Sequence, residues 1–394
     1  MNATDAHPDG GDSAPDPDVR SPTGSNASPS TDEEDDLTAA TLGFVIAGVA
    51  FAAALLGGPA GIGLVPAAVA ALALVAFGLR RYGVLGSAHG SAIAGGASLG
   101  LAGLATALTV APAVQISVEA STDVGLPVAA IAGAVATLVA GADHRGVPGD
   151  EIATMARAAG RGLLVGFGGL AAIVAWSGIL AVTIRSTVGT ELSPTVAIAL
   201  STLALGLGTG SVAAFVLRIR GVDLGYLDLH RPTVLDLAYV VGGVLVILGL
   251  NIAIGLAFMR FGVESATHSV VRQAQSTPEI LLVLIPLSYL VIGPGEELLF
   301  RNVIQKTLYR TFSKRGAVVV ASGIFALAHI FAYADPSGGI GTTIVTLLVI
   351  FALSIILGSV YARTENLVVP ILVHGTFNAI AFAATYAEIV GIGA

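Results

Sequence analysis

Three short motifs in the last third of the chain combine side chains that are able to do acid–base chemistry. They are Glu296-Glu297-x-x-x-Arg301, Phe325-x-x-x-His329 and His374-x-x-x-Asn378. Together they supply carboxylates, imidazoles, an amide and a guanidinium cation. A carboxylate or an imidazole can take a proton from water, and fixed N–H donors can stabilise an oxyanion. This set of residues therefore suits hydrolysis by an activated water molecule.

The residues that other hydrolases use as nucleophiles are missing or badly placed. The sequence contains no cysteine, which excludes a thiolate nucleophile, disulfides and thiolate metal ligands. No serine stands with a histidine and an acid in a recognisable nucleophile elbow. A serine triad is therefore not expected.

Spacing separates the two adjacent carboxylates of the first motif. Glu297 and Arg301 are four residues apart, so on a helix they share a face and can form an ion pair. Glu296 lies about 100° away around the same helix, so Arg301 does not satisfy it in the same way. One carboxylate is then structural and the other is free to act. The alternative is a charged pair at the membrane boundary, beside the basic residues that follow.

The two histidine motifs allow different interpretations. His329 stands alone in an apolar segment, where a histidine is often a packing residue. His374 and Asn378 are four residues apart and face the same way on a helix, so both can donate to one point. We expect His374 and Asn378 to act together.

The composition identifies the elements that must position these residues. The chain has 394 residues, of which 55% are hydrophobic and 11% charged, and its mean hydropathy is +0.87. Soluble domains carry about 25% charged residues. The composition therefore excludes a soluble globular enzyme and predicts an all-α polytopic membrane protein.

Eleven apolar segments are long enough, or nearly so, to span a bilayer as helices. They are 39–57, 60–79, 91–116, 124–141, 162–184, 197–217, 237–258, 280–299, 316–332, 341–361 and 367–389. With the N-terminus in the cytoplasm, alternation puts fourteen Lys and Arg residues on the cytoplasmic side and three outside. The positive-inside rule supports this orientation. We expect an integral protein of the cell membrane with a cytoplasmic N-terminus.

The chain divides into three regions by composition. Residues 1–36 hold ten acids and one base and are rich in Pro, Ser and Gly, which predicts a disordered acidic cytoplasmic tail. Residues 37–220 form an Ala- and Gly-rich membrane region of about six helices. Its small-residue pairs, such as Gly162/Gly166 and Gly206/Gly210, predict close helix packing. Residues 221–394 contain all three motifs.

In this order and on successive apolar helices, the motifs resemble those of the CPBP intramembrane proteases, the CaaX-processing and bacteriocin-processing endopeptidases also called the Abi family. The resemblance covers residues 280–381 most closely and predicts a protease core over 221–394. It implies that Glu296 is the catalytic base and that His329 helps to orient the water. Glu297 and Arg301 would hold the helix, His374 and Asn378 would stabilise the oxyanion, and Phe325 would line the site. Residues 37–220 are not explained by it.

The resemblance also bears on cofactors and partners. Substrates of the family are prenylated C-terminal tails and leader peptides, so we expect a peptide or protein substrate, with or without a lipid group, and membrane lipid around the chain. No nucleic-acid partner is expected. We favour chemistry without a cofactor. The alternative is a divalent metal such as zinc on Glu296, His329 and His374, although the sequence has no His-Glu-x-x-His motif.

Two other classes of function compete with the protease. A transporter is compatible with many spans and polar groups near the midplane, but its polar residues should line the whole depth of the bundle, whereas here the ionisable residues cluster in the last third. A membrane scaffold or immunity protein would keep the motifs and act by binding alone. Replacing Glu296 separates these readings, because only the protease needs its carboxylate.

Overall fold

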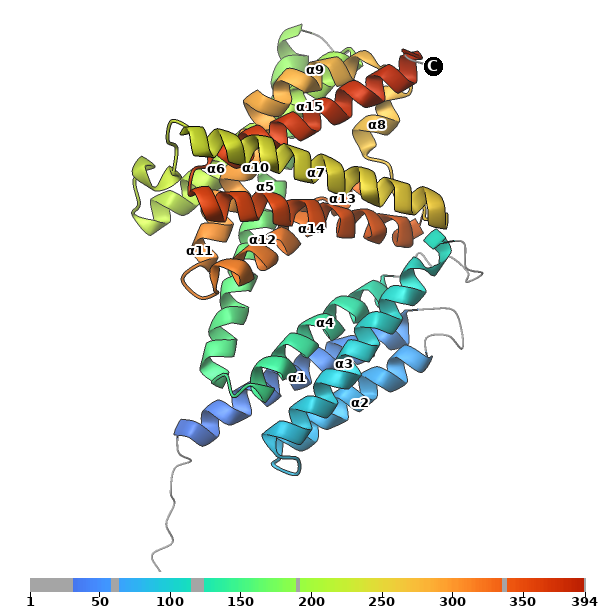
Figure 1. Ribbon diagram of the computed structural model, residues 1–394, viewed down its shortest axis with the longest axis vertical. Helices are drawn as coiled ribbons and strands as arrows, with labels where there is room; N and C mark the ends of the chain where they lie inside the picture. The colour runs from blue at the N-terminus through green and yellow to red at the C-terminus, as the bar shows by residue number, and fades with distance from the viewer. Residues whose placement is uncertain (1–30, 58–63, 115–123, 189–191, 335–338, 393–394) are drawn as a thin grey trace, which may run out of the picture.

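The computed structural model describes residues 31–57, 64–114, 124–188, 192–334 and 339–392, and within them the chain is helical and has no strand (Figure 1). The long helices are α1 (Thr31–Leu56), α2 (Leu64–Arg81), α3 (Ser87–Val110), α4 (Gly125–His144), α5 (Gly149–Val188), α6 (Pro194–Arg220), α7 (Val234–Phe261), α12 (Lys314–Ala328), α14 (Gly339–Thr364) and α15 (Val368–Val390). The short ones are η1 (Ala111–Val114), η2 (Leu224–Leu227), α8 (Ser269–Ala274) and α13 (Ile330–Tyr333). A further set of short pieces, between Glu279 and Leu308, carries the first motif.

Ten helices of the described residues are long and apolar enough to cross a membrane. The protein is therefore an all-α polytopic integral membrane protein, as the composition predicts. The expected eleventh span, at 316–332, forms α12 and α13 instead, which meet at His329 and are individually shorter than a span. Most of the predicted acidic tail, residues 1–30, lies outside the described residues, and α1 already begins at Thr31.

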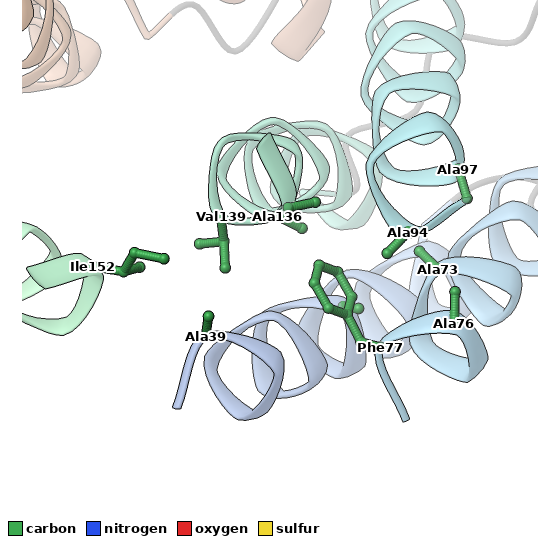
Figure 2. Packing of buried hydrophobic residues seen from close by; sticks show 11 residues of the cluster. Ala39, Ala73, Ala76, Phe77, Ala94, Ala97, Ala136, Val139 and Ile152 are labelled. Carbon is green, nitrogen blue, oxygen red and sulfur yellow. The ribbon is translucent and has the colours of Figure 1, made fainter. Parts of the chain in front are cut away.

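Helices α1–α4 pack on one another through small side chains, as one group in the lower part of Figure 1. Figure 2 shows the Phe77 ring lying among alanines of these helices. The ring presses on α1 at Gly43, where a Cβ atom would lie 2.1 Å from the ring. Glycine is needed there because any side chain would collide with Phe77. Close packing of small residues therefore holds this bundle together.

Helix α5 leads from this bundle to the remaining helices (Figure 1). Its glycines meet residues near the candidate site, since a Cβ on Gly162 or Gly166 would lie 2.8 or 2.9 Å from Ile324. A Cβ on Gly206 of α6 would lie 2.7 Å from Val291, whereas a Cβ on Gly210 would meet no atom of another element within 4 Å. Parts of α5 and α6 thus pack against the helices that carry the motifs. The division of the chain near residue 220 stays a prediction.

The helices that follow the α1–α4 bundle form a second group. Hydrogen bonds identify which chain segments lie together at each end of this group. At what we name the basic end, Arg220 bonds Thr307, Lys306 bonds Asp228 and Lys314 bonds Glu365. At the opposite end, the Ala266 N–H donates to the Thr342 carbonyl and the Arg272 side chain donates to the Ala334 carbonyl. Helix α7 runs from the basic end to the opposite end, and α14 runs back.

Candidate active site

The first motif lies in one continuous helical rod whose turns widen twice. The rod comprises α9 (Glu279–Leu287), η3 (Ser288–Ile292), α10 (Gly293–Glu297), η4 (Leu298–Gln305) and α11 (Lys306–Leu308). Pro294 has no N–H to give to the preceding turn, and the Gly293 N–H bonds the Ser288 carbonyl five residues back. The Lys306 N–H likewise bonds the Arg301 carbonyl. Such π-helical turns often occur at functional sites, and here they flank the two glutamates.

Glycines allow α10 and α15 to approach closely enough to bring two motifs together. A Cβ on Gly293 would lie 3.1 Å from the Ile371 carbonyl oxygen, and one on Gly375 would lie 2.8 Å from the Tyr289 ring. At Gly293 the two backbones therefore meet directly, and at Gly375 the backbone of α15 meets the Tyr289 ring. This contact places Glu297 beside His374, which directly precedes Gly375.

Glu297 is completely buried and joins three helices. Its Oε2 accepts from Arg301 Nε at 2.9 Å, as the spacing predicts, and its Oε1 lies 2.9 Å from His374 Nδ1. The Arg301 guanidinium continues to Ser354 Oγ on α14 at 3.0 Å. Both oxygens of Glu297 are thus occupied, so this carboxylate has a structural position. The contact with His374 was not foreseen from the sequence.

Glu296 faces both histidines and has a free oxygen. Its Oε2 lies 3.8 Å from His374 Nε2 and 3.9 Å from His329 Nε2. Both distances exceed that of a hydrogen bond, and Oε2 is buried without a hydrogen-bond partner. A buried carboxylate oxygen without a partner is costly. The gap between these three atoms can admit a small polar group such as water.

Phe325 and a backbone carbonyl hold His329 in place. His329 Nδ1 lies 2.8 Å from the Phe325 carbonyl oxygen, and because a carbonyl only accepts, Nδ1 must carry the proton. In the neutral ring, Nε2 then presents its lone pair toward Glu296. The Phe325 ring lies 4.5 Å from the His329 ring and 4.9 Å from the Arg301 guanidinium carbon. Phe325 therefore lines the site between a histidine and the buried cation.

A cavity of about 330 Å³ adjoins these residues. His329, His374 and Asn378 are among its lining residues, together with residues of α7 and α14. Asn378 is half-buried, and its side chain makes no hydrogen bond to another described residue. Its amide is therefore available to a molecule in the cavity, one helical turn from His374.

A second polar cluster, at the basic end, escaped the sequence analysis. Asp228 Oδ2 accepts from Lys306 Nζ at 2.8 Å and from the Tyr361 hydroxyl at 2.7 Å. Tyr361 also accepts from Asn302 Nδ2 at 3.2 Å. We name these four residues the latch. Asp228 and its partners are far apart in sequence, so only the fold brings them together. Ser354 was missed for the same reason.

The donor atoms of the three residues considered for zinc are spaced more widely here than the ligands of a bound zinc ion. Zinc bonds of about 2.0–2.1 Å in a tetrahedron put ligand atoms about 3.3 Å apart, whereas the donor atoms here are separated by 3.8 and 3.9 Å. Across the described parts of the chain, no group of three or more His, Cys, Asp or Glu side chains is arranged to hold a metal ion. Chemistry without a metal stays a prediction.

Comparison with known families agrees with the location of the motifs. Residues 278–380 match the family model described as type II CAAX prenyl endopeptidase Rce1-like. No curated protein and no solved structure matches the chain. The matched segment begins just before α9, ends within α15 and contains all three motifs.

Proposed function

Since the match over residues 278–380 identifies the chain as a membrane protease of the CAAX prenyl endopeptidase family, we propose that Glu296 activates a water molecule for hydrolysis of a peptide bond. The observation that carries this proposal is the unpaired Oε2 of Glu296, buried between two imidazoles. A general base needs a free lone pair near the water that it deprotonates. Glu297 has none to spare, because Arg301 and His374 occupy both of its oxygens.

The two histidines have different roles because their Nδ1 atoms have different partners. His329 donates from Nδ1 to the Phe325 carbonyl, so its neutral ring accepts at Nε2. A water molecule that donates to Glu296 and to His329 has its oxygen lone pairs free for attack. His329 thus orients the water, and Glu296 receives the proton that the water loses.

His374 is the donor of the pair. Its Nδ1 contacts the buried Glu297 carboxylate, and a protonated His374 with Arg301 balances the charges of Glu296 and Glu297. Balanced charge matters because an uncompensated buried charge is costly. Nε2–H then points toward the reacting centre. Together with the Asn378 amide it stabilises the oxyanion that forms when the water attacks the carbonyl carbon.

The reaction then completes without a further group. The tetrahedral intermediate collapses, the bond between carbon and nitrogen breaks, and the leaving amine takes the proton that Glu296 received from water. In this proposal the protein needs no metal or other cofactor, and His374 Nε2, being protonated, is no metal ligand.

The substrate class and the setting follow from the family and the charge distribution. We propose a peptide or protein substrate of the CAAX prenyl-protein or leader-peptide class, cleaved at the depth of Glu296 in the half of the bilayer near the basic end. The basic end and the N-terminus are cytoplasmic in this proposal, because Lys and Arg concentrate on the cytoplasmic side of membrane proteins.

The test is cleavage of a peptide library, with and without a prenylated C-terminus, by the purified protein in liposomes. Glu296→Gln keeps the size of the side chain and removes the base, so we expect kcat to fall by about 10²–10⁴-fold. The matched control is Glu279→Gln, an exposed acid at the start of the same helical rod, which should cleave like wild type. Full activity in Glu296→Gln would overturn the proposal, and binding without cleavage by wild type would favour a scaffold.

A chelator tests the metal-free chemistry separately. We expect the rate of the wild-type protein to be unchanged after dialysis against a strong zinc chelator. Loss of activity, with recovery on addition of zinc, would instead make Glu296, His329 and His374 metal ligands.

A further inference from the structure

Some of the polar side chains that line the cavity beside the catalytic cluster lie outside the three motifs. They are Asn251, Ser265, Tyr333, Thr346 and Ser354. The hydroxyls of Thr346 and Ser354 already accept hydrogen bonds, at 2.9 and 3.0 Å. Asn251 and Ser265 are exposed. Tyr333 alone in this set is half-buried and has a side chain that bonds no other described residue.

The Tyr333 hydroxyl is free to bind a molecule in the cavity. It makes no hydrogen bond to another described residue, and it does not belong to the buried side-chain atoms that lack a partner. An unbonded hydroxyl outside that group keeps contact with open space. Because the Tyr333 side chain lines the cavity, a molecule there can reach the hydroxyl.

Tyr333 continues the helix face that carries Phe325 and His329. The three residues are spaced four apart, and all three line the cavity. The Tyr333 N–H donates to the His329 carbonyl at 3.3 Å, so the helical turn between them is closed. Residues four apart on a helix are neighbours. Tyr333 therefore lies one turn from the imidazole that faces Glu296, on the side away from Phe325.

The hydroxyl keeps its proton and can act as a donor. Burial raises the pKa of Tyr333 to about 12, and the negative charge of Glu296 acts in the same direction. The carboxylate is thus close enough to influence the phenol electrostatically. At neutral pH Tyr333 offers an uncharged O–H group to the cavity.

Neighbouring elements hold Tyr333 in position. The His268 ring packs against the Tyr333 ring edge to face, with centroids 4.9 Å apart, and the Thr343 hydroxyl donates to the Tyr333 carbonyl at 3.1 Å. His268 is itself fixed, because its Nδ1 accepts from the Val270 N–H at 3.0 Å. A donor that is held in place before the substrate arrives loses less conformational entropy on binding.

Seen from the basic end, Tyr333 lies deeper than the residues around Glu296. Helix α12 begins at Lys314, which belongs to the basic end, and leads through His329 to Tyr333. In the proposed function, a C-terminal tail reaches Glu296 from the cytoplasmic side. Tyr333 then adjoins the residues that follow the cleaved bond.

We propose that Tyr333 is a substrate-positioning residue, whose hydroxyl donates a hydrogen bond to a main-chain carbonyl oxygen of the substrate. One helical turn equals about two residues of extended chain, so the carbonyl belongs to the first or second residue after the scissile bond. Each residue of a peptide carries one such acceptor. The proposal rests on the proposed function for the identity of the substrate.

Replacement of the hydroxyl tests this role. Tyr333→Phe keeps the ring, and we expect KM for a cleaved peptide to rise about three- to tenfold, the equivalent of one hydrogen bond. A bond made equally before and during the reaction leaves kcat within about twofold. The matched control is Tyr239→Phe, because Tyr239 is half-buried but does not line the cavity. An unchanged KM in Tyr333→Phe, or a fall confined to kcat, would overturn the proposal.

A modified substrate identifies the group that Tyr333 binds. In two peptides, a trans alkene replaces the first or the second peptide bond after the scissile bond, which removes one carbonyl and keeps the shape of the chain. For one of them, we expect Tyr333→Phe to have no further effect on KM. A full rise in KM with both peptides would overturn the assignment of the carbonyl.

Binding without cleavage distinguishes this proposal from the proposed function. In Glu296→Gln, which should bind but not cleave, Tyr333→Phe should raise Kd for the same peptide about three- to tenfold. If wild type cleaves no peptide but Kd still shifts, the proposed function fails and the role of Tyr333 stands. Equal Kd values with and without the hydroxyl would overturn that role.

Discussion

Each of the two helical groups buries an ion pair, and the two pairs are built differently. In the α1–α4 bundle, Arg80 Nη2 lies 3.3 Å from Asp143 Oδ1 across two helices. In the second group, Arg301 and Glu297 pair at 2.9 Å within one helical rod, and His374 and Ser354 extend the pair to two further helices. The first pair ties two helices together, whereas the second holds the groups around Glu296.

The residues that surround the two ion pairs also differ. Arg80–Asp143 lies in a bundle whose core is mostly alanine, with Phe77 as its largest side chain. Around Glu297, polar side chains from distant helices converge, and Glu296 Oε2 is left without a partner. A buried ion pair by itself therefore does not indicate a catalytic site. An unpaired acid next to an extended polar network and a cavity is the more informative feature.

The largest effect should follow from breaking the pair in the second group. Arg301→Leu leaves Glu297 buried without its cation, which costs about 3–5 kcal/mol of folding free energy, and it frees His374 to move. We expect no measurable cleavage and a lower thermal unfolding temperature in detergent. The control is Lys314→Met, which removes an exposed pair with Glu365 and should cost about 0–1 kcal/mol. Wild-type stability in Arg301→Leu would contradict the structural role of the pair.

Breaking the pair in the α1–α4 bundle should separate stability from activity. Arg80→Leu leaves Asp143 buried, so we expect a loss of stability of similar size, about 3–5 kcal/mol. The protein that remains folded should keep its specific activity, because Arg80 makes none of the contacts around Glu296. Specific activity is measured per folded molecule, after size exclusion. A fall comparable with that of Arg301→Leu would mean that the bundle takes part in catalysis.

A glycine substitution at the contact between η3 and α15 sharpens the comparison. Gly375→Val should push α15 away from η3, because a Cβ at Gly375 would lie 2.8 Å from the Tyr289 ring. We expect overpacking to cost about 1–3 kcal/mol and activity to fall more than 10-fold as His374 moves from Glu297. Gly96→Val in the bundle, where no atom lies within 4 Å of the added Cβ, should be silent in both assays.

The smallest effect should come from the latch. Asp228→Asn keeps the shape of the side chain but removes the charge that faces Lys306, and this pair is only partly buried. We expect a loss of about 1 kcal/mol in stability and a change of less than threefold in kcat. Asp223→Asn, an exposed residue in the same segment, serves as the reference. A large fall in kcat for Asp228→Asn would mean that closing the basic end is part of catalysis.

The sequence determined the fold class and located the three motifs. Apolar segments of the right length predict membrane helices because backbone groups in lipid must be satisfied within the chain. The spacing of four between Glu297 and Arg301 predicts their pair, because contacts within one helix depend only on residue number. The ordered motifs around Glu296, His329 and His374 indicated the chemistry, and the family match covers all of them.

Contacts between distant segments were decided only by the tertiary structure. The bond from His374 to Glu297, the latch around Asp228 and the cavity beside Asn251 each join helices whose separation in sequence carries no geometric information. The close approaches at Gly293 and Gly375 bring α15 against the rod that carries the glutamates. A glycine in the sequence marks where helices can meet, but not which helices do. Only the packed structure shows that Oε2 of Glu296 lacks a hydrogen-bond partner while both oxygens of Glu297 have one.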